Sequence, residues 1–140
     1  MFPRVLVVED DGPIRALLVT ALRRVGLEVE EAGDGAEALE MLAARSFGLM
    51  LIDLMMPRMD GYALIDEISR MSFERRPIVI VMTAFPDASV HHLNPHVVHA
   101  FLRKPFDLEM MVGMIQDAAR ELEGSGQPDA PAAEVRTPAS

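Results

Sequence analysis

Residues 5–11 read VLVVEDD, four branched apolar side chains followed directly by three acids. A short uninterrupted apolar run is typical of a parallel strand that is buried on both faces. Similar runs return at 49–52 (LMLI) and 78–82 (IVIVM), and a less regular one lies at 97–102. Residues 27–30 (LEVE) alternate apolar and polar side chains, which indicates an edge strand. The sequence therefore predicts five short strands.

Helical periods separate these strands, because apolar residues recur at spacings of three and four. Arg23 and Arg24 fall in the last turn of the first predicted helix, and Gly26 follows as its C-cap. A weaker helix is expected between Ala88 and Leu93. The stripes that define the other helices are Ile14, Leu17, Leu18, Ala21, Leu22 and Val25; Leu39, Leu42 and Ala43; Leu64, Ile65, Ile68 and Met71; and Leu108, Met111, Val112, Ile115, Ala119 and Leu122.

Alternating strands and helices predict an α/β fold, in which helices cover both faces of a parallel sheet. The chain has 140 residues and is half hydrophobic, which suits a single domain. We place this domain at residues 1–123. Residues 124–140 are mostly Gly, Pro, Ala and Ser, and they cannot bury enough apolar surface to offset their ordering entropy. We therefore expect a disordered tail.

Composition excludes several classes of function. The net charge is -9, with 22 acids against 13 basic residues, so direct binding to nucleic acid or to an acidic membrane surface is not expected. The chain has no cysteine, which rules out disulfides, thiol nucleophiles and zinc–thiolate sites. We see neither a signal peptide nor an apolar run long enough to span a bilayer, and we expect a cytoplasmic protein.

Acids stand where two predicted strands end. Glu9 and Asp10 follow the first strand and Asp53 follows the third. In an open doubly wound sheet, ligands bind beyond the carboxyl ends of the strands, where the strand order reverses. If the first and third strands flank that point, the three carboxylates converge. Their mutual repulsion is relieved by a hard cation such as Mg²⁺, which commonly bridges carboxylates to phosphate oxygens.

Two further strand ends supply groups that bind phosphate. The fourth strand ends at Thr83 and Ala84, and the fifth leads to Lys104 and Pro105. A hydroxyl and an ammonium can both hold phosphoryl oxygens. Phosphoryl transfer depends on positioning and charge neutralisation, and aspartate is a known nucleophile for it. The sequence thus predicts an aspartyl phosphate at Asp53.

These blocks resemble the receiver domain of bacterial response regulators over residues 4–122. The resemblance is carried by VVEDD at 7–11, IDLMMPRMDG at 52–61, MTA at 82–84 and KPF at 104–106. It implies a flavodoxin-like sheet of five parallel strands in the order 2-1-3-4-5. It also implies a stand-alone switch of a two-component system that takes its phosphoryl group from a sensor histidine kinase or a histidine phosphotransfer protein and acts on an unknown target.

The resemblance also implies a role for each site residue. Asp53 is the phosphoacceptor, and Asp10 and Asp53 bind Mg²⁺. Glu9 acts through a water and Met55 through its backbone carbonyl. The remaining roles are the following: Thr83 and Lys104 hold the phosphoryl group, Phe101 is the aromatic switch, Ala84 and Pro105 are auxiliary, and the Lys104–Pro105 peptide bond is cis.

Plainer interpretations exist for some residues. Asp11 can serve only as a helix N-cap and Asp60 with Gly61 as a turn and cap. Met110 and Met114 lie outside the predicted buried stripe of the last helix. They are therefore candidates for a partner-binding surface, although methionines more often fill the core. The four histidines, His91, His92, His96 and His99, are expected to lie on the solvated surface, with metal binding or pH sensing as the alternative.

Three other functions compete with the switch. An aspartate-nucleophile phosphatase typically has a second acid two residues after the nucleophile, where this chain has Met55. We therefore expect no enzyme activity beyond the chain's own phosphorylation and dephosphorylation. A receiver-like module that works without phosphate is the second alternative. The third is the N-terminal receiver of a truncated DNA-binding regulator.

Overall fold

Strand β1 (Arg4–Val8) pairs in parallel with β2 (Glu28–Ala32) on one side and with β3 (Leu49–Asp53) on the other. Strands β4 (Ile78–Thr83) and β5 (Val98–Arg103) extend the sheet beyond β3. The computed structural model describes residues 3–56, 59–84 and 93–125. Within them the strand order is β2-β1-β3-β4-β5, which confirms the predicted topology and places β2 at an edge.

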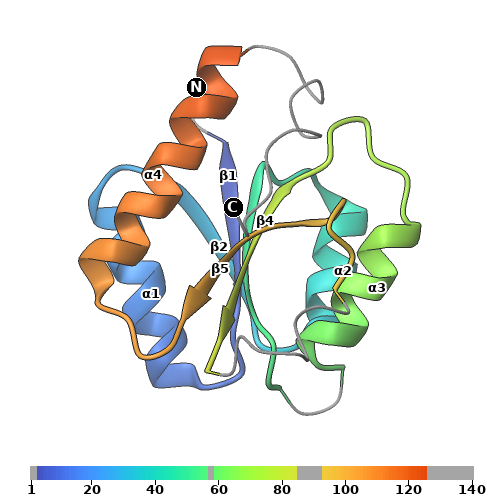
Figure 1. Ribbon diagram of the computed structural model, residues 1–140, viewed down its shortest axis with the longest axis horizontal. Coiled ribbons are helices and arrows are strands. Elements are labelled where there is room, and N and C mark those ends of the chain that lie inside the picture. The colour runs from blue at the N-terminus through green and yellow to red at the C-terminus, as the bar shows by residue number, and fades with distance from the viewer. Residues whose placement is uncertain (1–2, 57–58, 85–92, 126–140) are drawn as a thin grey trace.

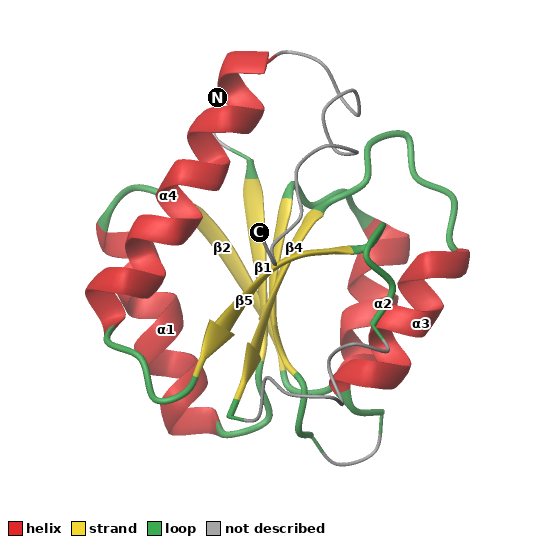
Figure 2. Cartoon of the chain, in the orientation of Figure 1, coloured by secondary structure: helices red, strands yellow, loops and turns green. Residues whose placement is uncertain are grey.

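Helices cover both faces of this sheet (Figure 1). Helices α1 (Gly12–Arg24) and α4 (Leu108–Ser125) lie on one face, and α2 (Gly35–Ala44) and α3 (Gly61–Arg70) lie on the other. Figure 2 shows the sheet as the middle layer, with the arrowheads of β4 and β5 directed to its lower edge. The carboxyl ends of all five parallel strands therefore share that edge.

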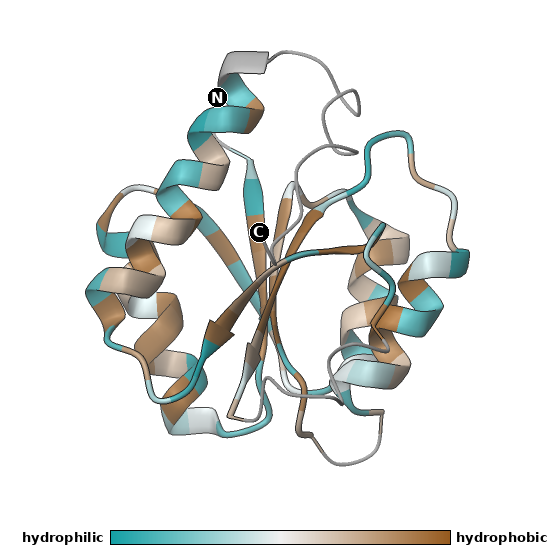
Figure 3. Ribbon diagram, in the orientation of Figure 1, coloured by the Kyte–Doolittle hydropathy of each residue, from teal (hydrophilic) through white to brown (hydrophobic). Residues whose placement is uncertain are grey.

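Figure 3 shows the uninterrupted apolar runs as brown strands between the helices. The two-sided cover of the sheet explains these runs. In β1, Leu6 and Val8 pack under α2 and α3, whereas Val5 and Val7 pack under α1 and α4. All four side chains are fully buried. Alternate residues of a strand point to opposite faces, so a strand between two helical layers needs apolar residues at every position.

The predicted apolar stripe of α1 is wrong in part. Its buried residues are Leu18, Val19 and Leu22, whereas Ile14 and Leu17 are 43% and 54% exposed. The sheet contacts the side of the helix that carries positions 15, 18, 19 and 22, and this side is rotated away from Ile14 and Leu17. Val25 is exposed because it is the C-cap, one residue beyond the last turn of α1, and Gly26 after it has a φ of 90°, as expected at a helix end.

Other sequence predictions fare unevenly. The stripe of the last helix is confirmed at Met111, Ile115 and Ala119, which are buried. Met110 is exposed as predicted, but Met114 packs against the core under α1 and α4. In the second helix Ala38 is buried and Ala43 is exposed. The helix expected at 88–93 lies outside the described residues except for Leu93, and so does the tail except for Gly124 and Ser125, which belong to α4.

His99 is not a solvated surface residue. It is half-buried, and its Nδ1 accepts a hydrogen bond from the backbone N–H of Val79 at 3.1 Å. The register of β4 and β5 shifts between Val79 and Ile80, so the imidazole replaces a ladder acceptor there. His96 is exposed as predicted, and His91 and His92 lie outside the described residues. Among the described residues, no helix combines the length and apolar character needed to cross a bilayer.

The rotation of α1 can be tested by two truncations in that helix. Leu22→Ala removes a fully buried side chain and should lower the free energy of unfolding by about 3 kcal/mol. Leu17→Ala removes an exposed side chain and should change the free energy of unfolding by less than about 0.5 kcal/mol. Urea denaturation followed by circular dichroism measures both. Equal losses would contradict the orientation described here.

Candidate functional site

Three carboxylates meet at the carboxyl edge of the sheet. Glu9 and Asp10 follow β1, and Asp53 is the last residue of β3. One oxygen of each lies within 4.8 Å of the other two. Glu9 and Asp53 are 2% and 3% exposed, whereas Asp10 is exposed to solvent. The convergence predicted from the sequence is therefore present, with two of the three acids buried.

Asp53 also has a cationic neighbour. The Lys104 Nζ lies 3.2 Å from the Asp53 Oδ1. The backbone N–H of Met55 donates to the same oxygen at 3.2 Å. Lys104 reaches the site from the end of β5, where its own N–H donates to the Thr83 carbonyl at 2.8 Å. The Lys104–Pro105 bond is cis, as predicted.

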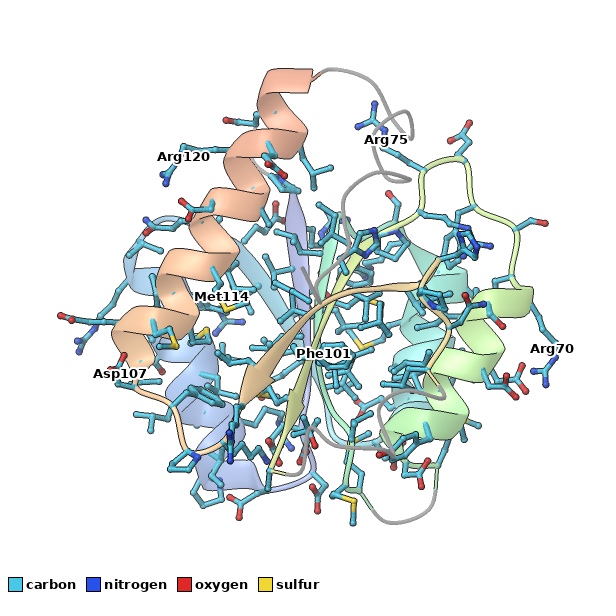
Figure 4. All side chains as sticks on the ribbon, viewed as in Figure 1. Arg70, Arg75, Phe101, Asp107, Met114 and Arg120 are labelled. Carbon is cyan, nitrogen blue, oxygen red and sulfur yellow. The ribbon has the colours of Figure 1, made fainter. Side chains whose placement is uncertain are left out.

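The other predicted residues surround this cluster. Thr83 ends β4, is buried, and stands one residue beyond Met82, the partner of Asp53 in the sheet register. Ala84 follows it and is exposed. The Met55 side chain is 64% exposed, and Pro105 is exposed. Phe101 lies in β5, partly buried (Figure 4), three residues before Lys104 and outside the carboxylate cluster.

Local sequence explains how the acidic loops are built. Asp11 is the N-cap of α1 and accepts from the Ile14 N–H at 3.0 Å, with Pro13 in the first turn. Asp60 caps α3 in the same way, accepting from the Ala63 N–H at 2.9 Å. Both are the capping roles that the sequence suggested. Asp11 thus starts the helix, while Glu9 and Asp10 remain for the site.

Glu9 is the electrostatically strained member of the cluster. Its Oε2 accepts from the Asp11 N–H at 3.2 Å, while its buried Oε1 has no hydrogen-bond partner. Burial, together with the nearby Asp53 carboxylate, raises the pKa of Glu9 from 4.5 to about 7, although the Asp11 N–H and the Lys104 ammonium act in the opposite direction. An orphaned carboxylate oxygen beside two further carboxylates is a donor set that suits a hard divalent cation.

Comparison with known proteins identifies the family. The sequence matches the response regulator receiver domain over residues 5–116. The chain belongs to the receiver domain family. Among curated proteins, this receiver is 38% identical over 128 residues to the DNA-binding transcriptional regulator NtrC of Escherichia coli, covering 89% of this chain and 26% of NtrC. It is 37% identical over 115 residues to the transcriptional regulatory protein PdtaR of Mycobacterium tuberculosis, covering 81% of this chain and 55% of PdtaR. The receiver thus spans about a quarter to a half of these relatives.

Solved structures agree with this assignment. The chemotaxis response regulator CheY4 of Vibrio cholerae superposes with a TM-score of 0.76 at 27% identity, covering 84% of this chain and 99% of CheY4. A sensor protein from Polaromonas sp. JS666 gives a TM-score of 0.74 at 30% identity, covering 86% of this chain and 98% of that protein. The flavodoxin-like receiver fold is therefore confirmed.

Two features of the receiver site were not predicted from the sequence. Gly61 packs directly on the backbone that follows β3, because a Cβ there would lie 2.6 Å from the Asp53 carbonyl oxygen and from the Leu54 Cα. Its N–H donates to the Leu54 carbonyl at 3.0 Å. Arg15 donates from Nη1 to the Glu9 carbonyl at 2.7 Å. The sequence signal for Arg15 is its spacing, since 15, 18, 19 and 22 share the buried face of α1.

The close approach of Gly61 predicts opposite effects at two helical glycines. Gly61→Ala must displace the backbone of Asp53 and Leu54, and should lower the free energy of unfolding by about 2 kcal/mol. Gly113→Ala meets nothing within 4 Å in α4, and should raise it by up to about 1 kcal/mol through helix propensity. Urea denaturation of both variants checks the pair, and a neutral Gly61→Ala would contradict the packing.

Glu9 should make the stability of the metal-free receiver depend on pH. In the unfolded chain Glu9 loses its proton near pH 4.5, but in the folded protein near pH 7. The folded state therefore binds more protons between these values, and the Glu9 contribution to the unfolding free energy falls as pH rises from about 5 to 7 and levels off above that. The total loss is at most about 3 to 4 kcal/mol, at about 1.4 kcal/mol per pKa unit.

Urea denaturation in EDTA at several pH values measures this dependence. Other acids contribute too, so the Glu9 share is the difference between wild type and Glu9→Gln. That difference should change through pH 5–7 and stay constant above pH 8. A constant difference over the whole range would show that Glu9 titrates normally.

Proposed function

We propose that this receiver is a phosphorylation switch in which Asp53 accepts a phosphoryl group with the help of Mg²⁺. The observation that carries the proposal is the convergence of the Glu9, Asp10 and Asp53 carboxylates next to the Lys104 ammonium. Family membership supports it, since receiver domains act in two-component systems. The proposed donor of the phosphoryl group is a sensor histidine kinase or a histidine phosphotransfer protein.

In this mechanism a carboxylate oxygen of Asp53 attacks the phosphorus of a phosphohistidine. An O–P bond forms, the P–N bond breaks, and the electron pair stays on the imidazole of the donor. Glu9, Asp10, Asp53 and the Met55 carbonyl are proposed to hold Mg²⁺. When bound, the ion neutralises charge on the carboxylates and the phosphoryl oxygens.

The remaining charge is taken up by residues of the chain. Lys104, already 3.2 Å from Asp53, is placed to pair with one phosphoryl oxygen. The Thr83 hydroxyl would donate to another, drawn toward the new anion. Phe101 on β5 would then change rotamer, so that one charged group biases a two-state element. Hydrolysis of the acyl phosphate returns inorganic phosphate and the Asp53 carboxylate.

Two surfaces suit the partners of such a switch. The exposed apolar residues Ile14 and Leu17 start α1 next to the site, and we propose this face for docking of the phosphodonor. Between β5 and α4 lies a cleft of about 380 Å³, lined by Phe101, Met110 and Met114 among others. Figure 4 shows Phe101 on the strand and Met114 on the helix. We propose this cleft for the downstream target.

Action on an external substrate is not part of the proposal. The residue two positions after the nucleophile is Met55, whose side chain is exposed and cannot act as a general acid. The DNA binding named for NtrC belongs to a protein about four times as long as the matched segment. Signalling through a protein partner is therefore the function that these residues support.

The proposal predicts covalent labelling at a single residue. Incubation with acetyl phosphate and Mg²⁺ should transfer one phosphoryl group to the wild-type protein, with acetate leaving as the P–O bond of the donor breaks. Asp53→Asn should gain no mass, because an amide is not a nucleophile of this kind. Intact-mass spectrometry measures both, and EDTA should abolish the gain in the wild type.

Three outcomes of this experiment separate the alternatives. Labelling of Asp53→Asn would show that the phosphoacceptor is a different residue. Absence of labelling in the wild type, combined with tight binding of beryllofluoride, would indicate an aspartyl phosphate too short-lived to detect. Absence of both would favour a receiver-like module that works without phosphate.

A further inference from the structure

Arg15 occupies a position where the fold calls for an apolar residue. Leu18, Val19 and Leu22, at spacings of three, four and seven from it, form the buried face of α1. The Arg15 side chain is only 25% exposed. A charged group on the inner face of a helix is costly unless its donors are well satisfied. The contacts of the Arg15 guanidinium should therefore explain why a charged residue stands at this position.

The guanidinium joins the ends of two strands. Its Nη1 donates to the carbonyl oxygen of Glu9 at 2.7 Å, and its Nε pairs with the Glu31 Oε1 at 2.9 Å. On the other side, the Glu9 N–H donates to the Ala32 carbonyl at 3.1 Å. The backbone of Glu9 is thus held from both directions, by β2 and by Arg15.

The oxygen that Arg15 holds belongs to the peptide unit between Glu9 and Asp10. A peptide unit is planar, so fixing its oxygen also fixes the direction in which the chain leaves Glu9 and enters Asp10. These are the two acids that β1 contributes to the carboxylate cluster. A change in the orientation of this peptide would move both side chains relative to Asp53.

We propose that Arg15 is a positioning residue for the cation site: it fixes the Glu9–Asp10 peptide so that both carboxylates point at Asp53. The inference rests on the proposed Mg²⁺ site. Glu31 orients the guanidinium, and Gly33 lies beside it, since a Cβ on Gly33 would be in van der Waals contact with Nη1 at 3.5 Å. Arg15 itself contacts neither Mg²⁺ nor phosphate in this proposal.

Charge and positioning make opposite predictions at this residue. Removing a positive charge near a cation site strengthens Mg²⁺ binding by simple electrostatics. Removing a group that positions ligands weakens it, and partners behind the direct ligands of a metal typically contribute about 10- to 100-fold in affinity. Weaker binding by Arg15→Ala therefore cannot be a charge effect.

Arg23 offers a matched control in the same helix. Its Nη2 donates to the Val29 carbonyl at 2.7 Å, so it also ties α1 to β2 through a backbone oxygen. This contact lies at the other end of α1, away from the carboxylates. Arg23→Ala loses the same charge and the same kind of hydrogen bond to a backbone carbonyl, without the Glu31 ion pair that Arg15→Ala also breaks, and should leave the cation site intact.

The test is isothermal titration of the metal-free full chain with MgCl₂, for wild type, Arg15→Ala, Arg15→Lys and Arg23→Ala. Arg15→Ala should raise the dissociation constant about 10-fold, and Arg15→Lys about 3-fold because an ammonium can still donate to the Glu9 carbonyl. Arg23→Ala should stay within about 2-fold of wild type. Urea denaturation in EDTA should show comparable small losses of stability for the two alanine variants.

Each result decides the matter. An unchanged or lower dissociation constant for Arg15→Ala would overturn the proposal and show that Arg15 has only a structural role. Equal weakening by Arg15→Ala and Arg23→Ala would assign the effect to loosening of α1 and would also overturn the proposal. Should Arg15→Ala not fold, Arg15→Lys against Arg23→Ala makes the same comparison. A wild-type protein that binds no Mg²⁺ would remove the proposed function, and this inference with it.

Discussion

The parallel pairing of β1 with β3 is the constraint on which the site depends. Neighbouring strands lie about 4.8 Å apart, and Val8 stands opposite Ile52, so the acids that follow these strands are forced together. Two of them, Glu9 and Asp53, are almost completely buried. Such a cluster costs free energy on its own, because each charge is desolvated and each repels the others. The Lys104 ammonium offsets only part of this cost. Because desolvation and the Asp53 charge still outweigh it, the pKa of Glu9 is raised.

Apolar packing in the rest of the fold offsets the free-energy cost of the carboxylate cluster. β1 and β3 are covered on both faces, and their side chains divide between two apolar cores, one under α1 and α4 and the other under α2 and α3. Burial of that apolar surface supplies the stability against which a strained edge can be maintained. The close contact of Gly61 with the Asp53–Leu54 backbone then fixes the loop after Asp53. A rigid scaffold with a destabilised edge is an arrangement from which a ligand can recover free energy.

The strands and the acidic cluster could be predicted from the sequence, because both depend on local patterns. Buried strands need apolar residues at successive positions, and acids at strand ends need only the rule that parallel strands share a carboxyl edge. The errors concern features that no local pattern records. The apolar stripe of α1 is wider than the area the sheet covers, so spacing alone could not choose between Leu17 and Val19. His99 meets Val79, twenty residues away, only because the register shifts at that point.

The misread rotation of α1 and the unforeseen role of Arg15 have one geometric origin. Successive residues of a helix are turned by about 100°, so a face that contains Leu18, Val19 and Leu22 is centred near position 15 and excludes positions 14 and 17. One orientation of α1 therefore brings the guanidinium to the Glu9 carbonyl and leaves Ile14 and Leu17 in solvent. An apolar residue at position 15 would cover the sheet equally well but would leave the Glu9 carbonyl without this donor. The polar exception in the stripe is thus the residue through which the helix acts on the site.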